Sequence, residues 1–379
     1  FHLWSDKFDR DLEDIFEVQD EISHKIAEKL RVELLEIGGD QLVKRPTDNL
    51  EAYTLYLKGR HLWSRRIESD LLRSVGYFEQ ATELDSNFAL GYAGLADARM
   101  VLADHDYRNR KEHLRLAEEA ANKALELDDS LAEPHAALAS ALYHQWKWIE
   151  AEREFKKAIE LNSSYPTAHQ WYGLYLIIMR RLQEAGEQLA LARELDPLSP
   201  AMIMAHSVYC YIAREYDKAI ETCRDGTELS GHWAFLMITG WSLVEKGDYV
   251  SAIEQLNRSR ELSSRQLREE KPPPDIVVFL GRAYALAGEA EKARSILKDC
   301  LQIASDGKFP STGIAALYIS LRDDISALEW LERASRDLED WLPTFSLTPL
   351  FDSVRNNPRF ISLLSRVGLS NKPEGGWRG

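Results

Sequence analysis

The sequence predicts an all-α fold, a right-handed superhelical solenoid of about eight helix-turn-helix repeats. A small residue followed four positions later by an apolar, usually larger one marks predicted helices at Ala151…Phe155 and Ala185…Leu189. The same pair recurs at Ala117…Ala121, Ala219…Cys223, Ala252…Leu256, Ala293…Leu297 and Ala327…Leu331. Successive pairs are 34, 34, 34, 33, 41 and 34 residues apart. A hydrophobic content of 45% supports a folded chain.

This period is the signature of a tetratricopeptide repeat (TPR) array. Each position of the pattern has a physical reason. Gly or Ala on the first helix and Ala on the second allow the two backbones to approach, and the large residue four positions later fills the gap beside them. A proline that closes a unit, as in Leu195-Asp196-Pro197, cannot continue the helix and starts the next repeat.

The chain opens with a segment that precedes the repeats. Residues 1–5 alternate apolar and polar side chains, which indicates a short strand. A long amphipathic helix is predicted from about Asp11 to Ile37, and Gly38-Gly39 ends it. Residues 38–49 are rich in Gly, Pro and polar side chains, which predicts a linker.

Four runs of residues in this opening segment carry a resemblance. They are Leu3-Trp4-Ser5, Phe8-Asp9-Arg10, Leu12-Glu13-Asp14-Ile15-Phe16 and Val18-Gln19-Asp20-Glu21-Ile22. Residues 1–37 resemble the C-terminal edge of a TolB-like domain, as found before TPR arrays in multidomain bacterial regulators. The resemblance implies a domain upstream, such as a nucleotide cyclase, a Ser/Thr kinase or a winged-helix DNA-binding domain. It implies a context for this chain and no activity of its own.

Residues 50–341 are predicted to form the TPR array. The expected units are 50–87, 88–131, 132–165, 166–199, 200–232, 233–266, 274–307 and 308–341. The second unit carries an insertion between its helices, from Asp104 to His113, and a Pro-rich insertion near residues 271–274 forms a hinge or lip. Residues 342–370 depart from the period and are predicted to form a single capping helix that covers the last repeat, with 371–379 as a loose tail. Because the chain starts at Phe1, we expect it to be part of a longer protein.

Composition and motifs exclude several classes of function. The formal net charge of -15 argues against a nucleic-acid-binding surface, and no apolar run reaches the roughly 18 residues of a membrane-spanning helix. The 3 cysteines favour a reducing compartment and buried thiols, so we expect a cytoplasmic location, or either side of the inner membrane if a span lies upstream. Phosphate-loop, nucleophile-elbow and zinc-helix motifs are missing, and the histidines are scattered. We therefore predict a non-enzyme without catalytic, cofactor-binding or metal-binding residues.

The candidate site is an apolar stripe on the first helices, which line the concave face of a TPR superhelix. Its residues are Leu174, Ile177, Ile178, Met204, Val208, Tyr211, Ile212, Met237, Trp241 and Val244. TPR domains that hold acidic chaperone tails carry Lys, Asn and Arg at these positions, so a carboxylate clamp does not fit. The stripe predicts a protein or peptide partner with an apolar or amphipathic segment.

Three alternatives to a foreign partner remain open at this point. The stripe could be covered by tight curvature of the superhelix, by the chain's own terminal segments, or by a homodimer contact. Trp146 and Trp148, beside the turn of the third repeat, are expected to pack between repeats. For the function as a whole, the first hypothesis is an interaction module, as a scaffold or sensory arm. The alternative is the regulatory part of a signalling enzyme such as a nucleotide cyclase, and a weaker one is the arm of a winged-helix regulator.

Overall fold

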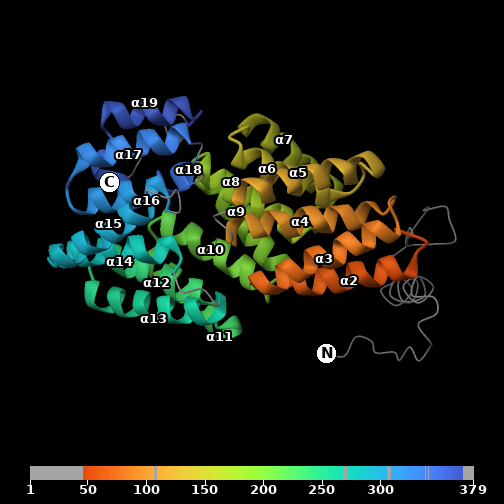
Figure 1. The fold of residues 1–379 in the computed structure, drawn as a ribbon, viewed down its shortest axis with the longest axis horizontal. Helices are drawn as coiled ribbons and strands as arrows, with labels where there is room; N and C mark the ends of the chain where they lie inside the picture. Colours follow the sequence, from red (N-terminus) through yellow and green to blue (C-terminus); the bar gives the residue numbers. More distant parts are fainter. Residues whose placement is uncertain are drawn as a thin grey trace.

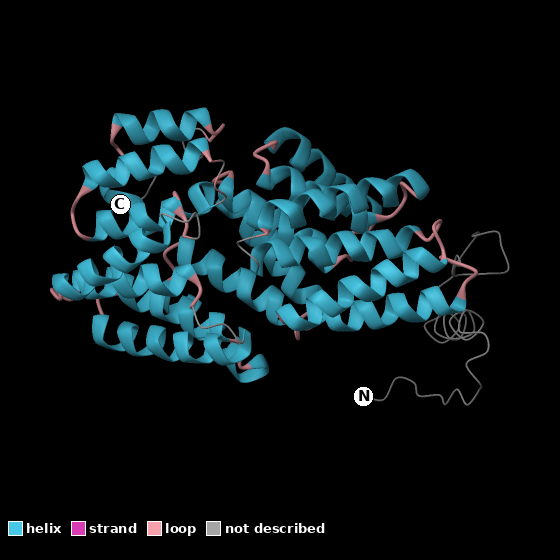
Figure 2. Ribbon diagram, in the orientation of Figure 1, coloured by secondary structure: helices cyan, strands magenta, loops and turns pink. Residues whose placement is uncertain are grey.

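The computed structural model describes residues 46–105, 109–267, 272–304, 309–337, 339 and 341–369. Within these ranges the secondary structure is helical, as Figure 2 shows, and the predicted all-α fold is confirmed. The predicted strand, long helix and most of the linker, as well as the tail, lie outside the described residues.

Within the described residues, eight consecutive helix pairs follow one another (Figure 1). In order they are α2 (Leu50–Ser64) with α3 (Glu68–Leu84), α4 (Ala89–His105) with α5 (Arg110–Leu127), α6 (Ala132–His144) with α7 (Trp148–Leu161), α8 (Pro166–Ile178) with α9 (Leu182–Leu195), α10 (Pro200–Ile212) with α11 (Tyr216–Ser230), α12 (Trp233–Glu245) with α13 (Tyr249–Leu267), α14 (Pro274–Leu286) with α15 (Ala290–Ala304), and α16 (Ser311–Ser320) with α17 (Asp324–Arg336). Each first helix contacts its own second helix and the first helix of the next pair, which is the stacking of a solenoid.

The expected insertion in the second repeat is largely helical. α4 continues to His105 and α5 begins at Arg110, so most of the Asp104–His113 segment extends these two helices. The Pro-rich insertion behaves differently, because α13 runs to Leu267 and Pro274 is the first residue of α14. Proline is favoured at that position, since its missing N–H would have no partner inside the helix.

In every pair except α4–α5, the two helices are joined by a tight turn in which one residue adopts a left-handed conformation. Between α8 and α9 this residue is Arg180, with φ 63°, and the N–H of Arg181 donates to the carbonyl of Leu176 at 2.9 Å. This closure satisfies a carbonyl that the helix end leaves open. The same backbone conformation recurs at Arg66, Trp146, Arg214, Gly247, Gly288 and Arg322.

The C-terminal segment caps the array with three short helices rather than the single one expected. They are α18 (Trp341–Phe345), the 3-10 helix η2 (Pro349–Val354) and α19 (Pro358–Arg366). α19 packs on α17, whereas α18 reaches α8, four pairs earlier in the array (Figure 1). Leu342, Phe351, Phe360 and Leu363 of this cap belong to the same apolar core as the repeats.

The cap folds back onto the middle of the array, where it contacts the third and fifth repeats. The indole Nε1 of Trp148 in α7 donates to the carbonyl of Val367 at 2.8 Å, although the two residues are 219 positions apart. Arg214, after α10, forms a salt bridge of 2.7 Å with Asp352 of η2. The prediction that Trp148 packs between repeats therefore needs a correction, because its indole nitrogen joins the third repeat to the cap.

Candidate functional site

The predicted stripe lies on α8, α10 and α12, but only part of it faces open space. Leu174, Met204 and Val208 are half-buried and line an open pocket. The remaining residues of the stripe are buried in the core: Ile177, Ile178, Tyr211, Ile212, Met237, Trp241 and Val244.

The C-terminal cap covers one end of the stripe. Phe345 of α18 lies with its ring centroid 6.4 Å from that of Trp241, and Trp241 in turn lies 5.6 Å from Tyr211. Phe279 of α14 stacks on Trp241 at 4.6 Å. The chain's own C-terminal segment thus occupies the region around Tyr211 and Trp241, which answers one of the alternatives left open by the sequence.

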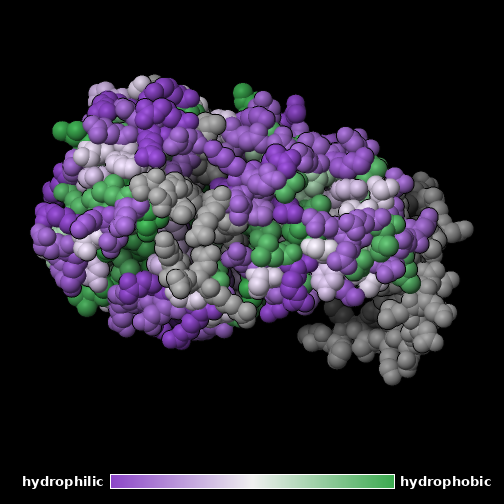
Figure 3. Space-filling view, viewed as in Figure 1, coloured by the Kyte–Doolittle hydropathy of each residue, from purple (hydrophilic) through white to green (hydrophobic). Residues whose placement is uncertain are grey.

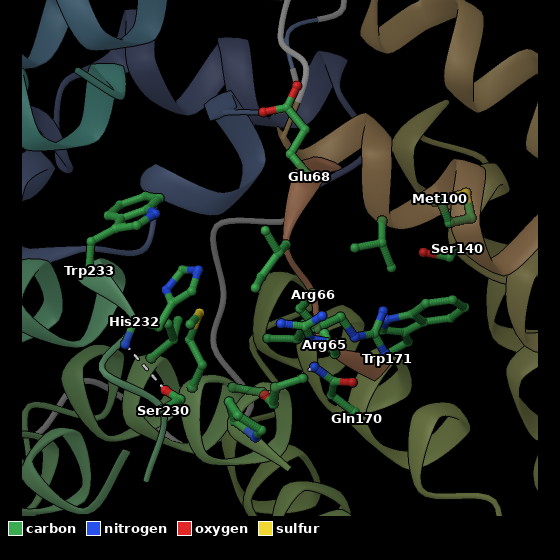
Figure 4. A pocket seen from close by; sticks show the side chains of 18 of the residues that line it. Arg65, Arg66, Glu68, Met100, Ser140, Gln170, Trp171, Ser230, His232 and Trp233 are labelled. Carbon is green, nitrogen blue, oxygen red and sulfur yellow. Dashed lines mark hydrogen bonds between the residues drawn. The ribbon is translucent and has the colours of Figure 1, made fainter. Parts of the chain in front are cut away.

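The uncovered end of the stripe opens into a pocket of about 410 Å³, called here the groove pocket. Its floor is apolar and comes from several repeats: Met100, Val101, Trp171, Leu174, Met204, Val208 and Trp233. Figure 4 shows Trp171 and Met100 on one side and Trp233 on the other, with Arg66 between them. In Figure 3 apolar side chains gather near α4 and α10, within a largely hydrophilic face. Its volume is within the roughly 300–1,000 Å³ typical of ligand sites.

A few polar groups surround this apolar floor. Gln170 donates to the carbonyl of Ala201 at 3.2 Å, while its own side-chain oxygen has no partner among the described residues. Arg65 is paired with Asp70 at 2.9 Å, and the guanidinium of Arg66 stacks 3.7 Å above the ring of Trp63. This combination suits an apolar side chain with nearby backbone hydrogen bonds better than a highly charged ligand.

Sequence reasoning missed several lining residues of the groove pocket. Trp171 and Trp233 lie outside the positions used to derive the stripe, and Met100 and Val101 come from a repeat that was not considered. A wider search for large apolar residues on first helices would have found Met100 and Trp171. It would not have placed them opposite Trp233, because that juxtaposition depends on the curvature of the array.

His135, His169 and the three cysteines occupy structural positions. His135 lies 2.7 Å from Glu154 and 3.2 Å from the carbonyl of Asp129, and His169 makes the equivalent contacts with Gln188 and Ser163 one repeat later. Cys210, Cys223 and Cys300 are buried free thiols, and burial raises the pKa of Cys210 and of Cys223 to about 11. In the described part of the chain, no group of three or more His, Cys, Asp or Glu is arranged to hold a metal ion.

Comparison with known proteins supports the fold. No protein-family model matches the chain. The "Putative adenylate cyclase 3" of Rhizobium meliloti (strain 1021) is 30% identical over 156 residues, which cover 40% of this chain and only 26% of that protein. Human IFIT1, solved as a dimer with m7Gppp-AAAA, superposes with a TM-score of 0.54 at 15% identity, over 85% of this chain and 78% of the IFIT1 chain. Yeast Tom70 superposes with a TM-score of 0.46 at 15% identity, over 94% and 78% of the two chains.

At 15% sequence identity, the similarity to these solved structures supports the fold alone. A search of the described helices for a membrane span finds none of the required length and hydropathy. The chain is an all-α solenoid of TPR-type helix pairs, closed on itself by its C-terminal cap.

Proposed function

We propose that this chain is a protein-interaction module that binds an apolar or amphipathic peptide segment in the groove pocket. The observation that carries the proposal is the half-buried set Leu174, Met204 and Val208 on the wall of an apolar pocket of about 410 Å³. An apolar surface of this kind on a solenoid is a common interaction site. The partner needs a large apolar side chain to fill the floor of the groove pocket. Gln170 can form a hydrogen bond with the backbone of the partner.

A binding experiment with a matched control tests the proposal. Peptides are selected on the wild-type chain from a random display library, and their affinities are compared with those for Val208→Glu and Val250→Glu. Val250 is 82% exposed on α13, so its replacement changes the net charge equally without touching the pocket. We expect apolar-rich peptides whose affinity falls at least tenfold in Val208→Glu and is kept in Val250→Glu. Equal affinity for both variants would contradict the proposal.

The same variants distinguish a foreign partner from a second copy of the chain. If the groove pocket mediates a homodimer, light scattering will show a dimer for the wild-type chain and a monomer for Val208→Glu. If the wild-type chain and Val208→Glu are both monomers, the groove pocket is free to bind a foreign partner.

A second candidate function is the regulatory arm of a nucleotide cyclase. The match to the Rhizobium meliloti relative supports it, and so does the resemblance of residues 1–37 to the end of a TolB-like domain. Sequencing the gene upstream of Phe1 tests this candidate, because a cyclase domain must be encoded there. An initiator Met directly before Phe1 would eliminate it, together with the winged-helix context that rests on the resemblance alone.

A further inference from the structure

A second cavity lies where the cap meets the array. It measures about 280 Å³ and is called here the closure cavity. The array contributes Tyr143, Tyr211 and Trp241 to its wall, and the cap contributes Trp341 and Phe345. Because α18 forms one side, the cavity exists only when the cap is docked.

One acidic group, Asp275, lies on this largely aromatic and aliphatic wall, which also carries the basic side chains of Arg110 and His144. Asp275 is the second residue of α14, directly after the Pro-rich insertion. No described residue forms a hydrogen bond or salt bridge with its carboxyl group through the side chain. Burial raises the pKa of Asp275 to about 7, although its own backbone N–H and the charge of Arg110 act in the opposite direction. A carboxyl group in such a place is costly to ionise without a cationic partner.

Arg110 carries the positive charge that acts on Asp275, but its guanidinium group is bound to other residues. Arg110 donates from Nη1 to the carbonyl of Ala103 at 2.7 Å, and its Nη2 lies 3.0 Å from Nδ1 of His144. These contacts hold the guanidinium on the α4 and α6 side of the cavity. Asp275 therefore lines the same cavity as the aromatic rings of Tyr211, Trp241 and Trp341, without an ion pair to Arg110.

Aromatic rings and a carboxylate together form a site for an organic cation. Ring faces attract ammonium groups, and the attraction is strongest for tryptophan and in a desolvated site. Trp341 stacks on Phe345 at 4.7 Å and Trp241 stacks on Phe279 at 4.6 Å, so both indoles are held in place. We propose that the closure cavity binds a small organic amine, with its ammonium group paired with Asp275 and its apolar body against Trp241 and Trp341.

Binding at this site stabilises the docked cap. A ligand that contacts both the array and α18 binds only to the closed form, so it shifts the population toward that form. The volume of about 280 Å³ lies below the usual range for drug-sized ligands, which restricts the class to small amines.

Thermal shift and calorimetry with a matched pair of probes test this inference. The probes are 2-phenylethylamine, which is cationic at neutral pH, and 2-phenylethanol, its neutral analogue. We expect the amine to raise the melting temperature and to bind at least tenfold more tightly than the alcohol. In Asp275→Asn this preference should be lost, whereas Asp129→Asn, an exposed aspartate outside the cavity, should behave like the wild type.

The outcomes separate clearly. Equal binding of the two probes would mean that the cavity is only apolar, and equal binding by the wild type and Asp275→Asn would remove the acid from the site; either result overturns the inference. Absence of binding by the amine at millimolar concentration overturns it too. A melting temperature of unliganded Asp275→Asn no lower than that of the wild type would show that this variant is folded, since Asp275 is a half-buried acidic group. Val208 lines both cavities, so these measurements rely on Asp275→Asn and Asp129→Asn and not on the groove-pocket variant.

Discussion

Gly173 of α8 packs directly against the side chain of Leu189 in α9. A Cβ atom at Gly173 would lie 2.6 Å from Cγ of Leu189 and 3.4 Å from the carbonyl oxygen of Ala185. Gly240 has the same distances to Leu256 and Ala252 in the sixth repeat. The small and large residues that mark the repeat in the sequence are thus packing joints between the two helices of a pair.

Gly173→Ala should destabilise the chain by roughly 1–3 kcal/mol, because the added methyl group overpacks the joint. Gly76→Ala is the matched control, since a Cβ atom there meets nothing within 4 Å inside α3. The control should stabilise the chain by about 0.5–1 kcal/mol through helix propensity. Urea denaturation followed by circular dichroism measures both, and a shift of the same sign for the two variants would refute the packing explanation.

Asp97 on α4 is a fully buried acid that burial makes harder to ionise. Arg60 contacts it at 2.8 Å, and the hydroxyl of Tyr165 donates to it at 3.2 Å. Burial nevertheless raises its pKa to about 6, above the unfolded value of 3.8, with Arg60 opposing the shift. The protonated form is therefore favoured by folding, so its contribution to stability is present below pH 3.8 and is lost as the pH rises through 6.

Asp97→Asn should remove this part of the pH dependence. Relative to the wild type, the variant should gain up to about 3 kcal/mol of stability between pH 4 and pH 7. Free energies of unfolding measured across this range for both proteins give the difference directly, and other titrating groups cancel in it. Parallel curves for the two proteins would show that Asp97 does not titrate in this range.

At the scale of elements, an unpaired charge is buried near the docked cap. Arg180, in the α8–α9 turn, is only 8% exposed, and its three guanidinium nitrogens have no partner among the described residues. Burial lowers its pKa to about 10, and the nearby charge of Arg355 adds to this effect. Arg355 itself donates to the carbonyls of Ser346 and Thr348 and is paired with Asp352.

Arg180→Met should stabilise the docked cap, because it keeps the aliphatic stem and removes an unpaired buried charge. The gain should be about 1–4 kcal/mol. Hydrogen exchange of amides in α18 and α19 should slow in this variant, while Arg224→Met, at an exposed position on α11, should leave it unchanged. Faster exchange in Arg180→Met would mean that the guanidinium supports the cap.

At the scale of the whole molecule, the contact between α7 and the end of the cap decides whether the solenoid is closed. Gly368 has φ +78°, and a Cβ atom there would lie 2.8 Å from Nε1 of Trp148. Gly247 has a similar φ of +81° with nothing within 4 Å of such an atom. At both positions an added side chain would be strained by the left-handed backbone, but only at Gly368 would it also meet Trp148 across the closure.

Gly368→Ala should therefore open the molecule, whereas Gly247→Ala should only lower its stability by about 1–2 kcal/mol. Small-angle X-ray scattering should show a larger radius of gyration for Gly368→Ala alone. The Gly368→Ala variant should also fail to bind 2-phenylethylamine, since the closure cavity forms only when the cap is docked. An unchanged radius in both variants would show that the Trp148 contact is dispensable for closure.

The sequence by itself determined the helix pairs and their joints. Local features suffice for this: the recurring small and large residues, such as Ala185 and Leu189, and the prolines that start new helices. These features also placed Leu174, Met204 and Val208 on first helices. The helices of the insertion in the second repeat were missed, because a departure from the period hides helical residues at its edges.

Only the tertiary structure decided which parts of the stripe are exposed and where its cavities lie. Trp241 and Val208 occupy equivalent first-helix faces in the sequence, but one is covered by α18 and the other lines the groove pocket. The docking of α18 on α8 depends on the accumulated curvature of several repeats, which no local pattern encodes. For the same reason an ordinary helix-start acid, Asp275, comes to face the aromatic side chains of a segment far away in the chain.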